Sequence, residues 1–305
     1  MFPGTLGIAV KAMRRFCVPF FFMVSGYFYM SDKTLNVKER KRKVWHICKI
    51  TFWATLFYLV FGIIQTVLYP SSFEPFSWKD ILIFLGCNKT FFITGEMWFL
   101  YALLYVYLVL VFVNPEWYRR NSGKIAVVCL TLYVFLAQGL YVVGYSLQNI
   151  VYKNWLIEGL GFFSLGFVLH QHQEKLKISN QVLWVIIILS TILSLVERYY
   201  LGRNFGVNIS SIPQVLALMI YAINNPLRHE GWIQRLGRDC SLMIYILHPA
   251  IGQSMDHIYQ LIGIWDNMPA RYLEPLLVVV LSILSAIAFN AIVRLCNQSI
   301  AAKLA

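Results

Sequence analysis

Apolar runs long enough to cross a lipid bilayer recur along almost the whole chain. At 1.5 Å per residue, a helix needs about 20 mostly apolar residues to cross roughly 30 Å of hydrocarbon. Runs of this kind lie near residues 13–30, 46–68, 93–113, 124–144, 155–171, 181–199, 208–224, 240–260 and 273–295. The sequence therefore predicts an all-α fold, a polytopic bundle of about nine transmembrane helices that forms a single domain over residues 1–305.

The composition excludes an ordinary soluble protein. Of 305 residues, 59% are hydrophobic and only 13% are charged, which leaves too little polar surface to cover a water-exposed globule. One further apolar run, residues 78–87, is too short to span and is expected to lie at the interface or to dip back into the protein.

The net charge of +12 follows from topology. If the first span runs from outside to inside, most Lys and Arg residues fall on the cytoplasmic side, as the positive-inside rule requires. The N-terminus is then external and the C-terminus cytoplasmic. Because this distribution accounts for the charge, we expect membrane lipids as partners and no nucleic acid.

The first span carries polar interruptions that are costly in lipid. Arg14 and Arg15 open it, and Pro19 and the pair Ser25-Gly26 divide it. Two carboxylates, Glu96 and Glu158, lie in the outer part of later spans. The simplest hypothesis is an ion pair between one of these arginines and one of these carboxylates, and a sharper one adds a cavity where a substrate binds.

Three further segments combine polar and aromatic residues. The segment 95–104 and the residue after it place Trp98, Tyr101 and Tyr105 on one helix face, as interfacial anchors do. Residues 155–167 contain glycines at 159, 161 and 166, which allow a neighbouring helix to approach closely. Residues 240–248 place Ser241, Tyr245 and His248 on one face, where the histidine serves either helix packing or chemistry.

A basic segment follows the first span and contains Lys38, Arg40, Arg42 and Lys43. Cations of this density suit anionic lipid or the phosphates of a phosphorylated substrate. His170 and His172 are two residues apart and face different sides of a helix, so no metal site is expected.

The segments 14–28, 95–104, 155–167 and 240–248, in this order, resemble the acyltransferase-3 family. The resemblance runs from Arg14 to His248 and on through the last helix. It implies an enzyme of the bacterial inner membrane that moves an acyl group, usually acetyl, from acyl-coenzyme A to hydroxyls of a cell-surface glycan. Acyl-coenzyme A is then a donor substrate, and no cofactor is expected.

The resemblance also implies residue roles. The candidate catalytic residues are Arg14, Arg15, Glu96 and His248; the candidate substrate-binding residues are Ser25, Trp98, Glu158 and Tyr245; the candidate acyl-coenzyme A ligands are Lys38, Arg40, Arg42 and Lys43.

The chain departs from the family pattern at several points. Glu96 stands where many members carry His, and Lys43 ends the basic segment where they carry Arg. The chain resembles helices two to ten of a ten-helix core, and the first-helix histidine that serves as base in the family has no counterpart in it. Two alternatives therefore stay open, a translocase of polysaccharide or a small molecule on the same fold, and an inactive truncated form.

Overall fold

The computed structural model describes residues 2–29, 36–68, 77–90, 95–203, 205–226, 229 and 231–304. The side chains of Glu96, of residues 296–297 and of residues 299–304 lie outside this description. Within the described residues the chain is helical and contains no strand, which confirms the all-α prediction.

The chain forms two compact units, a large unit of Lys11–Pro226 and a small unit of Met1–Val10 with Leu227–Ala305. The division falls within α1 (Gly4–Met13). The expected single domain over residues 1–305 stays a prediction.

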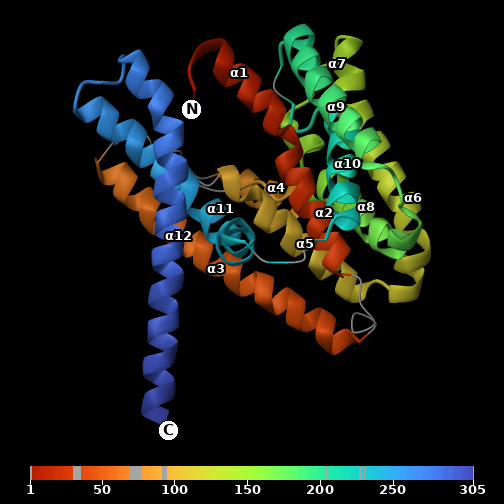
Figure 1. The fold of residues 1–305 in the computed structure, drawn as a ribbon, viewed down its shortest axis with the longest axis horizontal. Coiled ribbons are helices and arrows are strands. Elements are labelled where there is room, and N and C mark those ends of the chain that lie inside the picture. Colours follow the sequence, from red (N-terminus) through yellow and green to blue (C-terminus); the bar gives the residue numbers. More distant parts are fainter. Residues whose placement is uncertain are drawn as a thin grey trace. The chain divides into compact units, whose positions relative to one another are not determined.

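The large unit is a bundle built mainly on α2 (Cys17–Tyr29) and α8 (Leu160–Gln171), which lie side by side (Figure 1). The 3₁₀ turn η1 (Arg14–Phe16) precedes α2, and α8 also packs on α6 (Pro115–Val134). The remaining elements are α3 (Val37–Leu68), α4 (Trp78–Cys87), η4 (Gly95–Met97), α5 (Trp98–Phe112), η5 (Phe135–Gly139), α7 (Leu140–Val142), η6 (Asn149–Val151), η7 (Trp155–Gly159), η8 (Gln173–Lys175), α9 (Asn180–Leu201) and α10 (Ser211–Asn224).

Close glycine contacts hold α8 and its preceding turn against their neighbours. A Cβ atom on Gly161 would lie 3.0 Å from Cys129 Cβ of α6, and one on Gly159 would lie 3.4 Å from the ring of Phe22 of α2. A Cβ on Gly166 would strike the backbone of α2. The packing role predicted for these glycines is confirmed.

The expected count of about nine spans is not confirmed. Among the described residues, four helical segments are long and apolar enough to cross a membrane: Val37–Leu68, Pro115–Val142, Asn180–Leu201 and Met268–Leu295. Helices also lie in the other predicted spans. The helices α5 and α10 are short, with 15 and 14 residues, whereas α11 (Trp232–Leu261) has 30 residues but is not among the segments apolar enough to cross.

Residues 78–87 form the short helix α4, as predicted. Its N-terminus has a capping box in which the Ser77 hydroxyl accepts a hydrogen bond from a backbone amide and the Asp80 carboxylate accepts one from the Ser77 amide. Asn88 ends the helix in the left-handed region, at φ 48°. With 10 residues, α4 is about 15 Å long and does not reach across the hydrocarbon.

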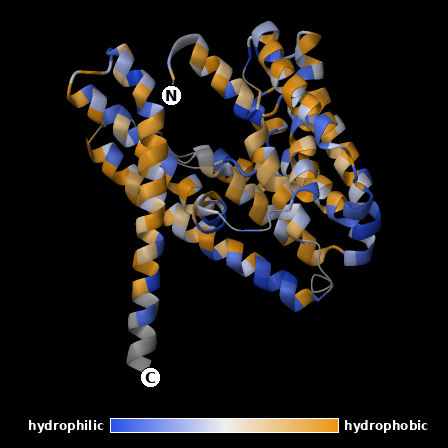
Figure 2. Cartoon of the chain, in the orientation of Figure 1, coloured by the Kyte–Doolittle hydropathy of each residue, from blue (hydrophilic) through white to orange (hydrophobic). Residues whose placement is uncertain are grey.

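The small unit is dominated by α11 (Trp232–Leu261) and α12 (Met268–Leu304), which pack against one another. Figure 2 shows that α12 is hydrophobic along much of its length. It also shows the contrast along α3 of the large unit, whose first turns are hydrophilic and whose later turns are hydrophobic. A helix of this kind enters an apolar environment from a polar one.

Candidate active site

The candidate site of the large unit centres on Glu158, which lies in the π turn η7. Asn154 caps this turn, because its side-chain oxygen accepts hydrogen bonds from the amides of Leu156 and Ile157, both at 3.0 Å. Its amide nitrogen donates to the carbonyls of the preceding η6 turn. Such π turns occur frequently at functional sites, where the extra residue redirects a side chain.

The Glu158 side chain is buried, with 1% of the residue exposed. Its Oε2 atom has no hydrogen-bond partner among the described residues. The cations whose charge acts on this carboxylate are Lys153 and Arg15. An unsatisfied buried carboxylate oxygen is costly, so it indicates a place where a hydrogen-bond donor binds.

Gly206 lies directly against this carboxylate. A Cβ atom on Gly206 would lie 3.0 Å from the Tyr133 hydroxyl and 3.3 Å from Glu158 Oε2. The Arg15 Nη1 atom donates to the Gly206 carbonyl at 3.3 Å. The Tyr133 hydroxyl accepts from the Val207 amide at 2.6 Å and donates to the Val207 carbonyl at 3.3 Å. The backbone of residues 206–207 therefore lines the space beside Oε2, and only a glycine leaves that space open.

Trp98 belongs to the same site through Lys153. The Lys153 ammonium lies 4.6 Å from the centre of the Trp98 ring, and this ring packs on Phe22 of α2 with a centroid distance of 5.9 Å. A cation over an aromatic face is attracted by the negative face of the ring. The indole thus positions Lys153 near Glu158 without neutralising it.

Glu197 of α9 anchors the segment that carries Gly206. Its carboxylate accepts hydrogen bonds from the amides of Ile209 at 3.0 Å and Ser210 at 2.8 Å, and from Gln138 Nε2 at 3.2 Å. The buried Asn208 side chain donates to Ser194 of α9. These contacts satisfy backbone amides ahead of α10 and hold residues 206–207 over the site.

The structure brings three of the predicted residues together, namely Arg15, Trp98 and Glu158. Arg14 lies in the same 3₁₀ turn and is exposed. Ser25 is almost three turns further along the helix than Arg15, and its hydroxyl donates to the Phe21 carbonyl of its own helix at 2.8 Å. The Glu96 side chain lies outside the described residues.

The basic segment at the start of α3 divides into two sets. Arg40 is buried and donates to the carbonyls of Leu110 at 2.7 Å and Val113 at 2.9 Å, at the end of α5. Lys43 donates to the last carbonyls of α2 and lies 4.8 Å from the Tyr29 ring. Both cations therefore stabilise helix C-termini.

Lys38 and Arg42 form the other set and are exposed. The Arg42 Nη2 atom lies 3.0 Å from Glu39 Oε2, in a surface ion pair of the i, i+3 type. Surface pairs of this kind contribute little to stability. Lys38 and Arg42 are thus the members of the segment that a phosphorylated ligand can reach.

In the small unit, His248 and Tyr245 lie on α11. The His248 Nδ1 atom is 3.1 Å from the Ile244 carbonyl and 2.9 Å from the Tyr245 carbonyl. Because carbonyl oxygens only accept, Nδ1 is the donor in these contacts. The Tyr245 and His248 rings are 6.1 Å apart.

Sequence reasoning missed Lys153, Tyr133, Gly206 and Asn88. Asn88 is buried, donates to the Trp98 carbonyl at 3.2 Å and accepts from the Trp155 amide at 2.7 Å. It therefore ties the starts of α5 and η7 together beside the site. Lys153, close to Glu158 in sequence, was the one signal available, since a cation beside a membrane carboxylate is a candidate partner.

These features define an integral membrane protein with a helical bundle and a buried carboxylate beside two cations. The acyltransferase domain family matches residues 2–295, nearly the whole chain. The chain belongs to the acyltransferase-3 family and is a membrane acyltransferase. Neither the curated proteins nor the solved structures contain a match to it.

Proposed function

We propose that this protein transfers an acetyl group from acetyl-coenzyme A to a hydroxyl of a cell-surface polysaccharide, across the bacterial inner membrane. The observation that carries the proposal is the Glu158 carboxylate, which is buried, has an unpartnered Oε2 atom and lies near Arg15 and Lys153. The family assignment supplies the reaction class, and the site supplies residues for it.

The reaction needs a proton acceptor and positive charge in defined places. The acceptor hydroxyl donates its hydrogen bond to Glu158 Oε2, and its oxygen attacks the thioester carbonyl carbon. The carbonyl oxygen becomes an oxyanion, which the Arg15 and Lys153 cations stabilise. Glu158 Oε2 takes the hydroxyl proton as this attack proceeds. When the carbonyl re-forms, the carbon–sulfur bond breaks, and the coenzyme A thiolate leaves and takes this proton from Glu158.

His248 of the small unit remains a proposed catalytic residue, and no step at the Glu158 site of the large unit is assigned to it. Its Nδ1–H is directed to backbone carbonyls, so in the neutral imidazole Nε2 is the atom that accepts a proton. Tyr245 and Ser25 remain proposed acceptor contacts. Arg14 and Glu96 remain proposed catalytic residues, and no step is assigned to them.

Donor recognition is proposed for the start of α3. Lys38 and Arg42 are exposed and meet the phosphates of the coenzyme, whereas Arg40 and Lys43 position this turn against α5 and α2. The cytoplasmic placement of α3's N-terminus, with an external N-terminus and a cytoplasmic C-terminus of the chain, is part of the proposal.

The test uses purified protein in proteoliposomes with acetyl-coenzyme A and polysaccharide. Free coenzyme A is measured with a thiol reagent, and acetylated acceptor by mass spectrometry. Glu158→Gln is expected to lower turnover at least a hundredfold, while Glu116→Gln, at an exposed position of α6, leaves it unchanged. Wild-type turnover in the Glu158→Gln protein would remove Glu158 from the reaction.

A matched histidine pair tests whether His248 takes part in the reaction. His248→Gln is expected to lower turnover, and His172→Gln is its control, because His172 makes the same kind of Nδ1 contact, at 3.0 Å from the Val168 carbonyl, at an exposed position. Movement of acceptor across the membrane with no release of coenzyme A by the wild-type protein would instead identify a translocase.

A further inference from the structure

A hollow of about 330 Å³ lies between α11 and α12 of the small unit. Its inner wall is apolar and its rim is basic. The hollow is lined by Leu236 and Cys240 of α11 and by Ile283 and Ile287 of α12, with the arginines Arg235 and Arg294 at its rim. The site has no place in the acyl-transfer reaction proposed above.

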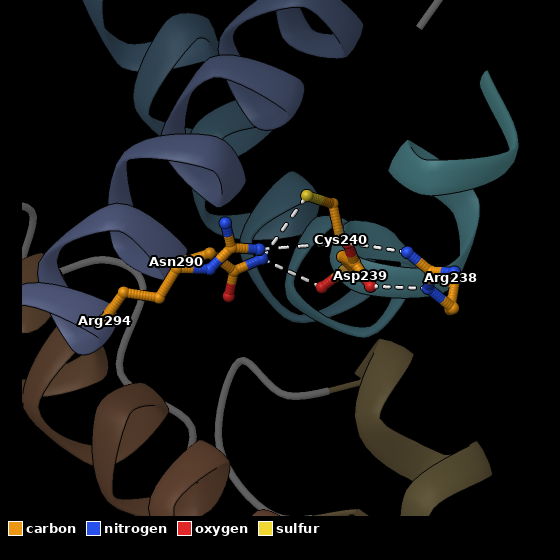
Figure 3. Close-up of polar contacts among 5 residues, drawn as sticks. All are labelled: Arg238, Asp239, Cys240, Asn290 and Arg294. Atoms are coloured by element: carbon orange, nitrogen blue, oxygen red, sulfur yellow. Dashed lines mark hydrogen bonds and ion pairs between the residues drawn. The ribbon is translucent and has the colours of Figure 1, made fainter. Parts of the chain in front are cut away.

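The rim carries an arginine cluster organised by one carboxylate. Figure 3 shows Arg238 and Arg294 reaching Asp239 from different directions, with Arg294 coming from α12. The Arg238 Nε atom is 2.9 Å from Asp239 Oδ1, and the Arg294 Nη2 atom is 3.9 Å from Asp239 Oδ2. Arg235 also acts on this carboxylate electrostatically. Three cations therefore share one anion. Of the residues that line the hollow, Arg235 and Arg294 are cations and Asp239 is an anion, so the rim has excess positive charge.

Asn290 of α12 connects this helix to α11 beside Asp239. Its Nδ2 atom donates to the Asp239 carbonyl at 2.8 Å and lies 3.4 Å from Cys240 Sγ (Figure 3). The guanidinium groups above it stay accessible, since the Arg294 side chain is 72% exposed. The cluster is thus held in place by α11–α12 contacts and is open to a ligand.

The polarity changes steeply along one face of α12. Ile283, Ile287 and Arg294 lie on this face, and residues 275–293 contain no charged side chain. The eleven residues from Ile283 to Arg294 cover about 16 Å of helix axis. Met268–Leu295 is one of the segments apolar enough to cross a membrane, so Arg294 lies at its boundary. A lipid headgroup lies at such a boundary, and its acyl chain lies along the apolar residues.

We propose that this hollow, lined by Arg235, Arg294 and the Ile283–Ile287 face, binds an anionic phospholipid. The phosphate and headgroup meet the arginines, whose planar guanidinium groups match phosphate oxygens. One acyl chain fills the apolar wall of α12. The excess of cations selects an anionic headgroup over a zwitterionic one, and the apolar wall favours a lipid over a free phosphate.

Native mass spectrometry of the whole protein, released from detergent with added phosphatidylglycerol or phosphatidylcholine, tests this proposal. The wild-type protein is expected to retain phosphatidylglycerol at least tenfold more than phosphatidylcholine. The double variant Arg235→Gln/Arg294→Gln is expected to lose this preference, and Arg119→Gln/Arg120→Gln, at exposed positions of α6, to keep it.

A second variant probes the apolar wall without changing charge. Ile287→Trp fills the hollow and is expected to reduce phosphatidylglycerol retention while circular dichroism shows unchanged helix content. Equal retention of the two lipids by the wild-type protein, or unchanged preference in the arginine double variant, would overturn the proposal. Displacement of the lipid by inorganic phosphate or coenzyme A at equal concentration would also overturn it, since the site would then be one for soluble anions.

Discussion

The carbonyl oxygen of Met23 in α2 lies 1.9 Å from the position that a Cβ atom on Gly166 of α8 would take. The relationship is reciprocal, because a Cβ on Gly26 of α2 would lie 1.9 Å from the Phe163 carbonyl oxygen of α8. The two backbones are therefore in direct contact at two levels, and glycine is the residue that permits it. This crossing fixes α8, and with it the π turn that carries Glu158.

Gly166→Ala is expected to destabilise the protein by about 1–3 kcal/mol or more, since backbone atoms cannot move aside as a side chain does. The helix propensity of Ala recovers only about 1 kcal/mol. The measurement is the melting temperature in detergent. Gly123→Ala on α6 is the control, because its nearest atom would be 3.9 Å away, and it is expected to melt at or above the wild-type temperature. Equal melting of the two variants would contradict the close crossing.

Asn88→Ala is expected to destabilise the region of the site. It removes the hydrogen bonds to the Trp98 carbonyl and the Trp155 amide, each costing about 1–3 kcal/mol when its partner stays buried, and it places Ala at φ 48°. Asn88→Gly relieves the backbone strain alone and is expected to melt between Asn88→Ala and wild type. Asn121→Ala, which loses one exposed hydrogen bond, is the control.

The basic segment of α3 is expected to separate into binding and structural residues. Lys38→Gln/Arg42→Gln is expected to raise KM for acetyl-coenzyme A about tenfold with no change in melting temperature, because both side chains are exposed. Arg40→Gln is expected to lower the melting temperature, since the carbonyls of Leu110 and Val113 lose a charged donor at about 1.5–3 kcal/mol. A raised KM with an unchanged melting temperature in Arg40→Gln, together with a lowered melting temperature in Lys38→Gln/Arg42→Gln, would show that Arg40 binds the donor and that Lys38 and Arg42 are structural.

The start of α4 is expected to loosen in acid. The hydrogen bond from Lys89 holds the pKa of the Asp80 carboxyl below its ordinary value of 3.8, with the Ser77 amide as a smaller contribution. The ionised Asp80 therefore contributes its full stabilisation above pH 3.8. This stabilisation is lost as the pH falls through the lower pKa that Asp80 has in the folded state. Hydrogen exchange of residues 77–89, corrected for intrinsic rates, is expected to accelerate below that pH. Asp80→Asn is expected to lack this acceleration.

The helical segments could be predicted from the sequence because apolar runs in a membrane leave the helix as the main way to satisfy backbone groups. The same logic placed α4 and the packing glycines. The expected count of about nine spans exceeds the four segments that are long and apolar enough among the described residues, since an apolar run does not show where a regular helix begins and ends; α5, for example, begins only at Trp98 and has 15 residues. The sequence assigned Arg40 and Lys38 the same role as ligands of the donor. Their burial differs because the end of α5 packs on Arg40, and this contact is set by the fold.

An all-helical membrane protein follows from the sequence alone, and so does the need of Arg15 and Glu158 for partners, because charge in lipid demands compensation. The tertiary structure decided which partners those are. Tyr133 and Gly206 reach Glu158 from segments as far apart as residues 133 and 206. A buried contact of this kind is set by the packing of helices distant in the chain, and no local pattern encodes it.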